Sequence, residues 1–194
     1  MTLRITYQGM TLKQLRDKFP PSLVSRALNR AQNRTLASAH TALSRKIRQD
    51  YAIRAADVNS IKTLKSANKM NPDAVLTYIG KRLPLKAFNP KQKNIRVNTV
   101  YGKTARRKQV TVKVKKAQRR MAITSVPAFL GKSGDVFYRT TKERFPIRKA
   151  FVISIPEMMM AQEQKELFAK VVKEKMPAEF TQNMNYFLSQ LAGS

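Results

Sequence analysis

A helical repeat of apolar residues between Ser22 and Asp50 constrains the fold of this chain more than any other feature. Apolar residues recur there at steps of three and four, the spacing of an amphipathic helix that buries one face. Pro21 and Ser22 are typical start signals, so we predict a long helix that ends at about Asp50. Its apolar stripe is rich in small residues, which predicts close packing on a sheet or a second helix. The stripe consists of Leu23, Val24, Ala27, Leu28, Ala31, Leu36, Ala39, Leu43 and Ile47.

The charge of the chain limits what it can bind. The 194 residues include 39 Lys+Arg and 11 Asp+Glu, a net charge of +28, while 42% are apolar, enough for a folded core. The excess is concentrated in the middle, where residues 51–125 hold 19 basic and 2 acidic side chains. Charge that is distributed so unevenly indicates a contact surface for a polyanion or for an assembly that neutralises it.

The composition excludes several classes of protein. Cysteine is absent, which rules out disulfide frameworks, thiolate metal sites and cysteine nucleophiles, and His40 is the only histidine. We therefore expect no metal and no cofactor. No stretch approaches the roughly 20 apolar residues that cross a bilayer, and the opening MTLRITYQGM lacks the apolar core of a signal peptide. We expect no membrane partner.

The remaining patterns predict further helices and strands. We expect a short helix over 55–67, a strand over 74–79, three strands within 122–155, and C-terminal helices that begin at Pro156 and after Pro177. The fold class is therefore α+β, with a long N-terminal amphipathic helix and C-terminal helices packed on a mostly antiparallel sheet. We predict a single domain over residues 1–194, with an N-terminal lead-in at 1–20, a basic hairpin arm at 89–121 and the C-terminal helices at 156–194.

The basic arm is the strongest candidate for a functional surface. Residues 97–101 and 109–114 alternate in polarity, which predicts a β-hairpin whose turn, at 102–108, is basic. Such an arm can neutralise phosphates along a nucleic acid, or it can dock on an acidic patch of a partner protein, and the two readings have equal weight. The candidate contact residues are Lys103, Arg106, Arg107, Lys108, Lys113, Lys115, Lys116, Arg119 and Arg120.

No combination of residues predicts an enzyme. Gly131-Lys132-Ser133 lacks the upstream glycine and the following helix of a phosphate-binding loop, so we expect a tight turn. His40 falls within the long helix, where we expect a polar surface residue. Asp57 and Asp73 are isolated and suit capping and turn formation, although they keep open the alternative of a metal-dependent nuclease. Met158, Met159 and Met160 suit a core or a subunit contact.

Several of these segments together resemble a known family. The chain is similar to phage minor tail protein Z, the tail completion family of lambda-like phages, over roughly residues 22–180. The resemblance rests on Ala27-Leu28-Asn29-Arg30-Ala31, Leu83-Pro84-Leu85, Pro127-Ala128-Phe129, Val136-Phe137-Tyr138-Arg139, Pro146-Ile147 and Ile155-Pro156, which follow one another in the family's order.

The resemblance implies a structural virion protein that is assembled in the host cytoplasm. It implies a ring of six copies at the head-proximal end of the tail, or neck, where the protein finishes the tail and joins it to the head. The implied partners are tail terminator, tail tube and connector proteins, together with the end of the genomic DNA. A ring that lines the channel and a collar around it both fit. The alternative from composition alone is a basic nucleic-acid-binding module that contacts the phosphate backbone.

Overall fold

The predicted long helix is present as α2 (Pro21–Asp50). A computed structural model of the chain describes residues 2–5, 19–98, 104–123, 128–141 and 143–192. The fold is α+β, as predicted, with long helices and small antiparallel sheets. Two compact units are formed from interleaved segments. Unit 1 contains residues 1–46, 59–79 and 156–194, and unit 2 contains residues 47–58 and 80–155. That residues 1–194 act as one domain stays a prediction.

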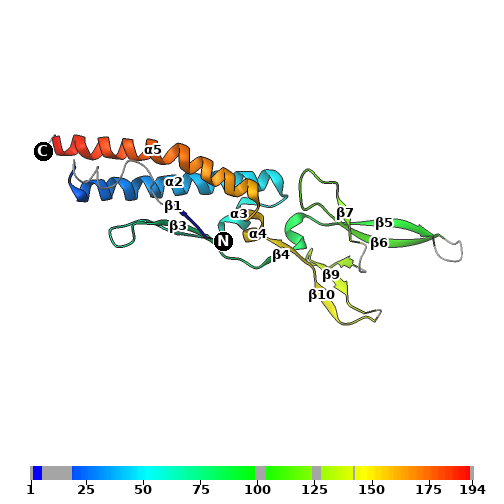
Figure 1. The fold of residues 1–194 in the computed structure, drawn as a ribbon. Coiled ribbons are helices and arrows are strands. Elements are labelled where there is room, and N and C mark those ends of the chain that lie inside the picture. Colours follow the sequence, from blue (N-terminus) through cyan, green and yellow to red (C-terminus); the bar gives the residue numbers. More distant parts are fainter. Residues whose placement is uncertain (1, 6–18, 99–103, 124–127, 142, 193–194) are drawn as a thin grey trace. The chain divides into compact units, whose positions relative to one another are not determined.

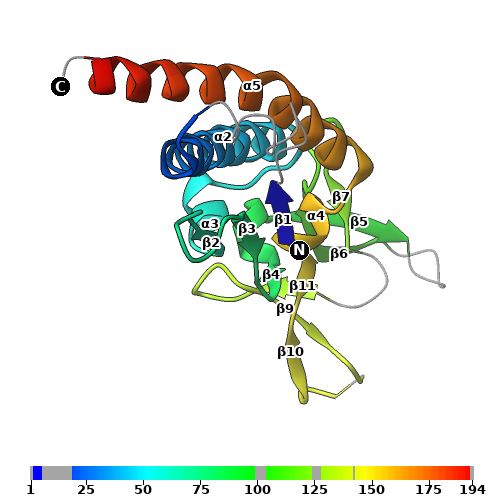
Figure 2. The same ribbon diagram turned by 60° about the vertical axis from the view of Figure 1, so that its left-hand side comes forward.

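Unit 1 has three layers, with α2 in the middle (Figures 1 and 2). The long C-terminal helix α5 (Gln162–Ala192) covers one side of α2. An antiparallel sheet of order β1-β3-β2 covers the other side. Its strands are β1 (Thr2–Ile5), β2 (Lys62–Lys65) and β3 (Ala74–Tyr78). Part of the predicted lead-in is therefore a strand of this sheet, paired with β3 from Thr2↔Thr77 to Ile5↔Ala74.

Helix α2 is buried on two sides because it packs against both layers. Toward α5, the Thr35 hydroxyl lies 3.7 Å from Met176 Sδ. Toward the sheet, His40 contacts Tyr78 of β3, whose alternate residues Ala74, Leu76 and Tyr78 are fully buried. Ala27, Ala31 and Ala39 are also fully buried, which fits the close approach predicted from the small residues in the stripe.

Helices α2 and α5 run antiparallel. Arg34 pairs with Glu179 at 3.3 Å and Lys46 pairs with Glu163 at 3.3 Å, so positions farther along α2 meet positions earlier in α5. The prediction of a break before Pro177 is wrong, because α5 continues through this proline. Proline lacks the N–H that would bond to residue 173, a loss of roughly 3 kcal/mol in a helix interior. Burial of Met176 and Phe180 beside Pro177 compensates for that loss.

The helix predicted over 55–67 is only partly correct. Helix α3 (Ala55–Asn59) ends early, and strand β2 takes up Lys62–Lys65. Asp57 accepts a hydrogen bond from the backbone N–H of Arg54 at 3.3 Å, which confirms its predicted role in capping. The three-residue spacing of Val58, Ile61 and Leu64 is also typical of a helix, which explains the prediction. The free edge of β3 instead offers a backbone partner for every residue of β2, from Lys62↔Tyr78 to Lys65↔Val75.

Unit 2 consists of three small antiparallel sheets. Their strands are β4 (Arg82–Pro84), β5 (Lys91–Asn98), β6 (Thr104–Val112), β7 (Met121–Ala122), β8 (Ala128–Leu130), β9 (Val136–Arg139), β10 (Ile147–Lys149) and β11 (Phe151–Ser154). The orders are β5-β6-β7, β10-β9-β8 and β11-β4. A 3-10 turn, η1 (Leu85–Phe88), follows β4 and buries Leu85 and Phe88. The short helix α4 (Ile155–Met159) connects unit 2 to unit 1. In α4 Met158 and Met159 are buried, as predicted for a core role, whereas Met160 is exposed.

The prediction that His40 lies on the helix surface is wrong. It is 6% exposed, between α2 and the sheet. Its Nδ1 lies 2.8 Å from the Tyr78 hydroxyl and its Nε2 lies 3.0 Å from Asn59 Oδ1. Because Asn59 Oδ1 only accepts, Nε2 donates and Nδ1 accepts from Tyr78, so this arrangement needs a neutral imidazole. Burial lowers the pKa of His40, the Asn59 hydrogen bond opposes that shift, and the charge of Lys62 adds to it. Burial also raises the pKa of the Tyr78 hydroxyl.

We expect His40 to make the folded chain sensitive to mild acid. The unfolded chain takes up a proton on His40 below its ordinary pKa of 6.5, whereas the folded chain resists it. The free energy of unfolding should therefore fall as the pH drops below about 6.5, by at most about 1.4 kcal/mol per pH unit from this group. Urea unfolding at pH 7.5 and pH 5.5 measures it. His40→Gln should lose this part of the pH dependence, and an equal dependence in both proteins would contradict the assignment.

Candidate interface

The predicted basic hairpin is present and begins earlier than expected. Strands β5 and β6 pair continuously from Lys91↔Thr111 to Asn98↔Thr104. The prediction that Arg106, Arg107 and Lys108 lie in the turn is wrong, because all three belong to β6. The strands are longer than the alternating segments because the backbone hydrogen bonds between β5 and β6 do not depend on a regular side-chain pattern. Lys103 and the rest of the turn lie outside the described residues.

The register of the arm places two basic positions directly opposite each other, Arg96 and Arg106. Like charges directly opposite in an antiparallel pair are destabilising unless an anion compensates them. The chain contains no Asp or Glu between Asp73 and Asp135, so the whole arm is free of acids. The arm therefore suits an anionic partner outside its own sequence.

The base of the arm is fastened within unit 2. The Lys116 N–H donates to the carbonyl of Asp50 at 2.8 Å, and the Ala52 N–H donates to the carbonyl of Val114 at 2.9 Å. The Lys115 ammonium lies 5.9 Å from the centre of the Tyr51 ring. Val110 and Val112 turn inward and are buried, as the alternation predicts. These contacts hold the last part of β6 and the segment after it on the rest of the unit.

The candidate contact residues differ in their exposure and in the contacts that they already make. Lys108, Lys115, Lys116 and Arg119 are exposed, and Lys113 is half-buried. Within the described part of the chain, no ion pair joins any of these five to an acid. Arg120 has a structural role instead, because its Nη2 donates to the carbonyl of Asn89 at 2.5 Å and to that of Thr111 at 3.3 Å. Arg120 thus ties the two ends of the arm together.

We expect Arg120 to matter for stability and its neighbour for contact. Hydrogen bonds from a charged group contribute about 1.5–3 kcal/mol each. Arg120→Ala should therefore lower the free energy of unfolding by about 2 kcal/mol and speed hydrogen exchange at the base of β5 and β6. Arg119→Ala is the matched control, since Arg119 is exposed, and should leave both unchanged. Equal effects of the two substitutions would contradict the anchoring role.

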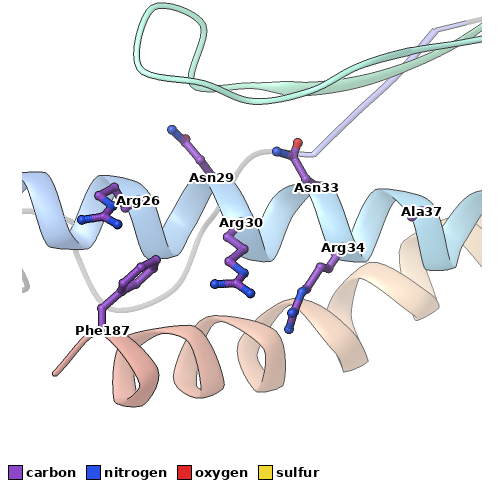
Figure 3. A pocket seen from close by; sticks show the side chains of 7 residues that line it. All are labelled: Arg26, Asn29, Arg30, Asn33, Arg34, Ala37 and Phe187. Carbon is purple, nitrogen blue, oxygen red and sulfur yellow. The ribbon is translucent and has the colours of Figure 1, made fainter. Parts of the chain in front are cut away.

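A second basic feature lies where α2 and α5 meet. Figure 3 shows Arg26, Asn29, Arg30, Asn33 and Arg34 on successive turns of α2, with Arg26 beside Phe187 of α5, Arg30 and Arg34 pointing toward α5, and the two asparagines pointing away from it. These residues line a shallow groove of about 510 Å³. The apolar stripe of α2 predicts its packing face but gives no sign of these arginines' aromatic partners in α5. These contacts could have been predicted from two features of the sequence: the arginines four residues apart in one helix, and the adjacent tyrosine and phenylalanine near the end of the other.

The arginines in this groove hold the two helices together. The Arg26 guanidinium lies 4.6 Å from the centre of the Phe187 ring, and that of Arg30 lies 5.0 Å from the Tyr186 ring. Such cation–π contacts contribute about 0.5–1 kcal/mol at exposed sites. The amide of Asn33 makes a reciprocal pair with the backbone of Ala67, at 3.1 Å and 2.7 Å, which holds the end of β2 on α2. The groove is therefore explained by the packing of unit 1.

The described residues contain no cluster of three or more His, Asp or Glu side chains that could hold a metal. Among the same residues, no helix is long and apolar enough to cross a membrane. Gly131–Asp135 forms the predicted tight turn, closed by hydrogen bonds from Gly134 N–H to the Gly131 carbonyl at 2.9 Å and from Gly131 N–H to the Asp135 carbonyl at 2.8 Å. Lys149 pairs with Asp135 at 2.9 Å and lowers the pKa of that carboxyl. This turn is structural.

An α+β scaffold that presents an acid-free basic arm has the character of a protein that binds other macromolecules. Residues 11–192 match the family model described as prophage minor tail protein Z (GPZ), and the chain belongs to this family. It is therefore a structural protein of the phage tail and not an enzyme. The match extends beyond the 22–180 resemblance at both ends and takes in both units. No curated protein and no solved structure matches the chain.

Proposed function

We propose that the chain is a ring subunit at the head-proximal end of the phage tail, where it completes the tail and connects it to the head. The observation that carries this proposal is the arm β5–β6, which has basic residues on both strands and no acid, on a member of a tail-protein family. A protein that meets acidic tail-tube, terminator or connector surfaces, or the end of the genomic DNA, needs such a surface. Six copies form the ring in this proposal.

The position in the particle is tested by labelling. A small tag on the exposed β2–β3 connection, at Met70, keeps the label away from the arm. Immunogold electron microscopy of purified particles should show one band at the joint between head and tail. A label along the tail tube, at its distal tip, or on no particles would contradict the proposal.

Charge reversal in the arm tests its role in assembly. Arg106→Glu, Arg107→Glu and Lys108→Glu together should reduce the yield of complete particles at least tenfold, because acidic surfaces then repel the arm. Circular dichroism should show the fold unchanged. The matched control reverses Lys69, Lys165 and Lys173, which lie outside the arm, and should give particles at nearly the normal yield. Loss of the fold in the arm variant would show that these positions are structural.

We expect the isolated chain to be a monomer or a weak oligomer at low salt. A net charge of +28 on each copy makes a free ring strongly self-repulsive until acidic partners neutralise it. Sedimentation velocity at low and moderate ionic strength measures this. A stable hexamer at low salt without partners would contradict the expectation.

A nucleic-acid role for the arm remains the second candidate, and the acid-free stretch between Asp73 and Asp135 favours it. In that case the purified chain should bind duplex DNA with an affinity that falls steeply with salt, because each neutralised phosphate releases counterions. The arm variant should flatten the slope. Strong DNA binding with no label on particles would move the assignment to this candidate.

A further inference from the structure

The described residues of unit 2 form an open apolar groove. The groove has a volume of about 660 Å³ and is bounded by residues of β4, β6, β7, β8, β9 and β11. Two of its large apolar side chains face solvent, Met121 at 62% exposure and Phe151 at 55%. Val114 and Ile123 continue the apolar lining, and the exposed Lys81 and Arg82 form a basic rim. Large exposed apolar side chains that gather around a groove indicate a contact site for another apolar surface.

The C-terminal part of α5 has the complementary chemistry. After Lys175 the chain contains no lysine or arginine, the longest such stretch in a protein with 39 of them. The buried face of this part, with Phe180, Met184 and Phe187, is used against α2, while Leu191 remains 58% exposed near the helix end. The last turn of α5 carries no basic residue. Its terminal carbonyls and the negative end of the helix dipole therefore lack a cation from their own helix.

We infer that the C-terminal turns of α5 from one copy dock in the apolar groove of unit 2 on the next copy. Leu191 enters beside Met121 and Phe151, and Lys81 and Arg82 on the rim face the carbonyl end of the helix. The occupant is a second copy because the last turns of α5 combine an exposed Leu191 with no lysine or arginine of their own, which lowers the repulsion between two basic chains at this contact. The nearest cations, Arg26 and Arg30 of α2, are engaged with the aromatic rings of α5. Two different surfaces then meet in a head-to-tail contact, which closes into a ring when the rotation allows it. The inference rests on the ring proposed above and names its interface.

Disulfide trapping tests the contact directly, because the chain has no cysteine of its own. Particles are assembled with the double variant Met121→Cys and Leu191→Cys, oxidised, and run on a non-reducing gel. We expect a ladder of covalent dimers, trimers and larger products that ends at the ring. Each single variant should give no ladder. The matched control is Met70→Cys with Leu191→Cys, in which an even more exposed methionine lies on the β2–β3 connection, and it should give no ladder either.

Three outcomes would overturn the interface. They are monomer alone in the double variant, a faster-migrating monomer with an internal disulfide, and an equal ladder in the Met70 control. A label at the head–tail joint without a ladder would keep the proposed function and remove this interface. If the chain is absent from particles, the same oxidation is carried out on the purified protein at high concentration. A ladder from the purified protein would support the contact between copies, although the proposed position at the neck would be wrong. The absence of a ladder would overturn the contact.

Charge exchange provides a second readout. Leu191→Lys places a positive charge against the basic rim and should reduce the yield of complete particles at least tenfold. Lys81→Glu with Arg82→Glu in the same chain should restore most of the yield. Lys69→Glu, a reversal on the β2–β3 connection, should not restore it. Equal rescue by Lys69→Glu would show that only net charge matters and would overturn the proposed pairing.

Discussion

The burial of α2 on two sides is the constraint on which unit 1 depends. A helix between a sheet and a second helix has few positions left for charge, and each buried polar group needs a partner. Two of the buried polar side chains of α2 have specific partners in the flanking layers, His40 with Tyr78 and Thr35 with Met176. The partly buried Asn33 is matched in the same way to the backbone of Ala67. These matches fix the register of both layers on α2, because sliding either layer by one residue would leave the groups unsatisfied.

The acids of the chain form ion pairs within the two units, and their positions decide which of the basic residues stay uncompensated. Among the described residues, five acids pair with nearby cations: Asp57 with Arg54, Asp135 with Lys149, Glu163 with Lys46, Glu174 with Lys170 and Glu179 with Arg34. Exposed ion pairs of this kind contribute only about 0–1 kcal/mol each to stability. Their larger effect is on the distribution of charge, because the helices are partly neutralised while the arm, without any acid, is not. The charge of the arm is therefore available to a partner, as expected for a tail protein that works within an assembly.

Prediction from the sequence was most accurate where the apolar period is long and the partner layer is local. The repeat from Ser22 to Asp50 predicted α2 nearly to the residue, and the short apolar run at 74–79 predicted β3. It failed where a short pattern was ambiguous, since Val58, Ile61 and Leu64 fit a helix until β3 provides an edge for β2. It also failed at Pro177, because the local preference against a helix is outweighed by burial against α2. For the candidate interface, the sequence predicted the basic residues, but not that Arg120 is a structural tie or that Arg106 and Arg107 lie within a strand.

The sequence by itself determined the α+β class, the long amphipathic helix, the acid-free basic arm and the membership of the tail-protein family. These properties follow from periodicity, charge and residue order, which do not depend on what a segment packs against. Only the tertiary structure decided the setting of His40, the anchoring of Arg120, the stacking of Arg26 and Arg30 on aromatic rings, and the groove beside Met121 and Phe151. Each of these depends on side chains that are distant in the sequence, and local patterns carry no information about which distant segments the core brings together.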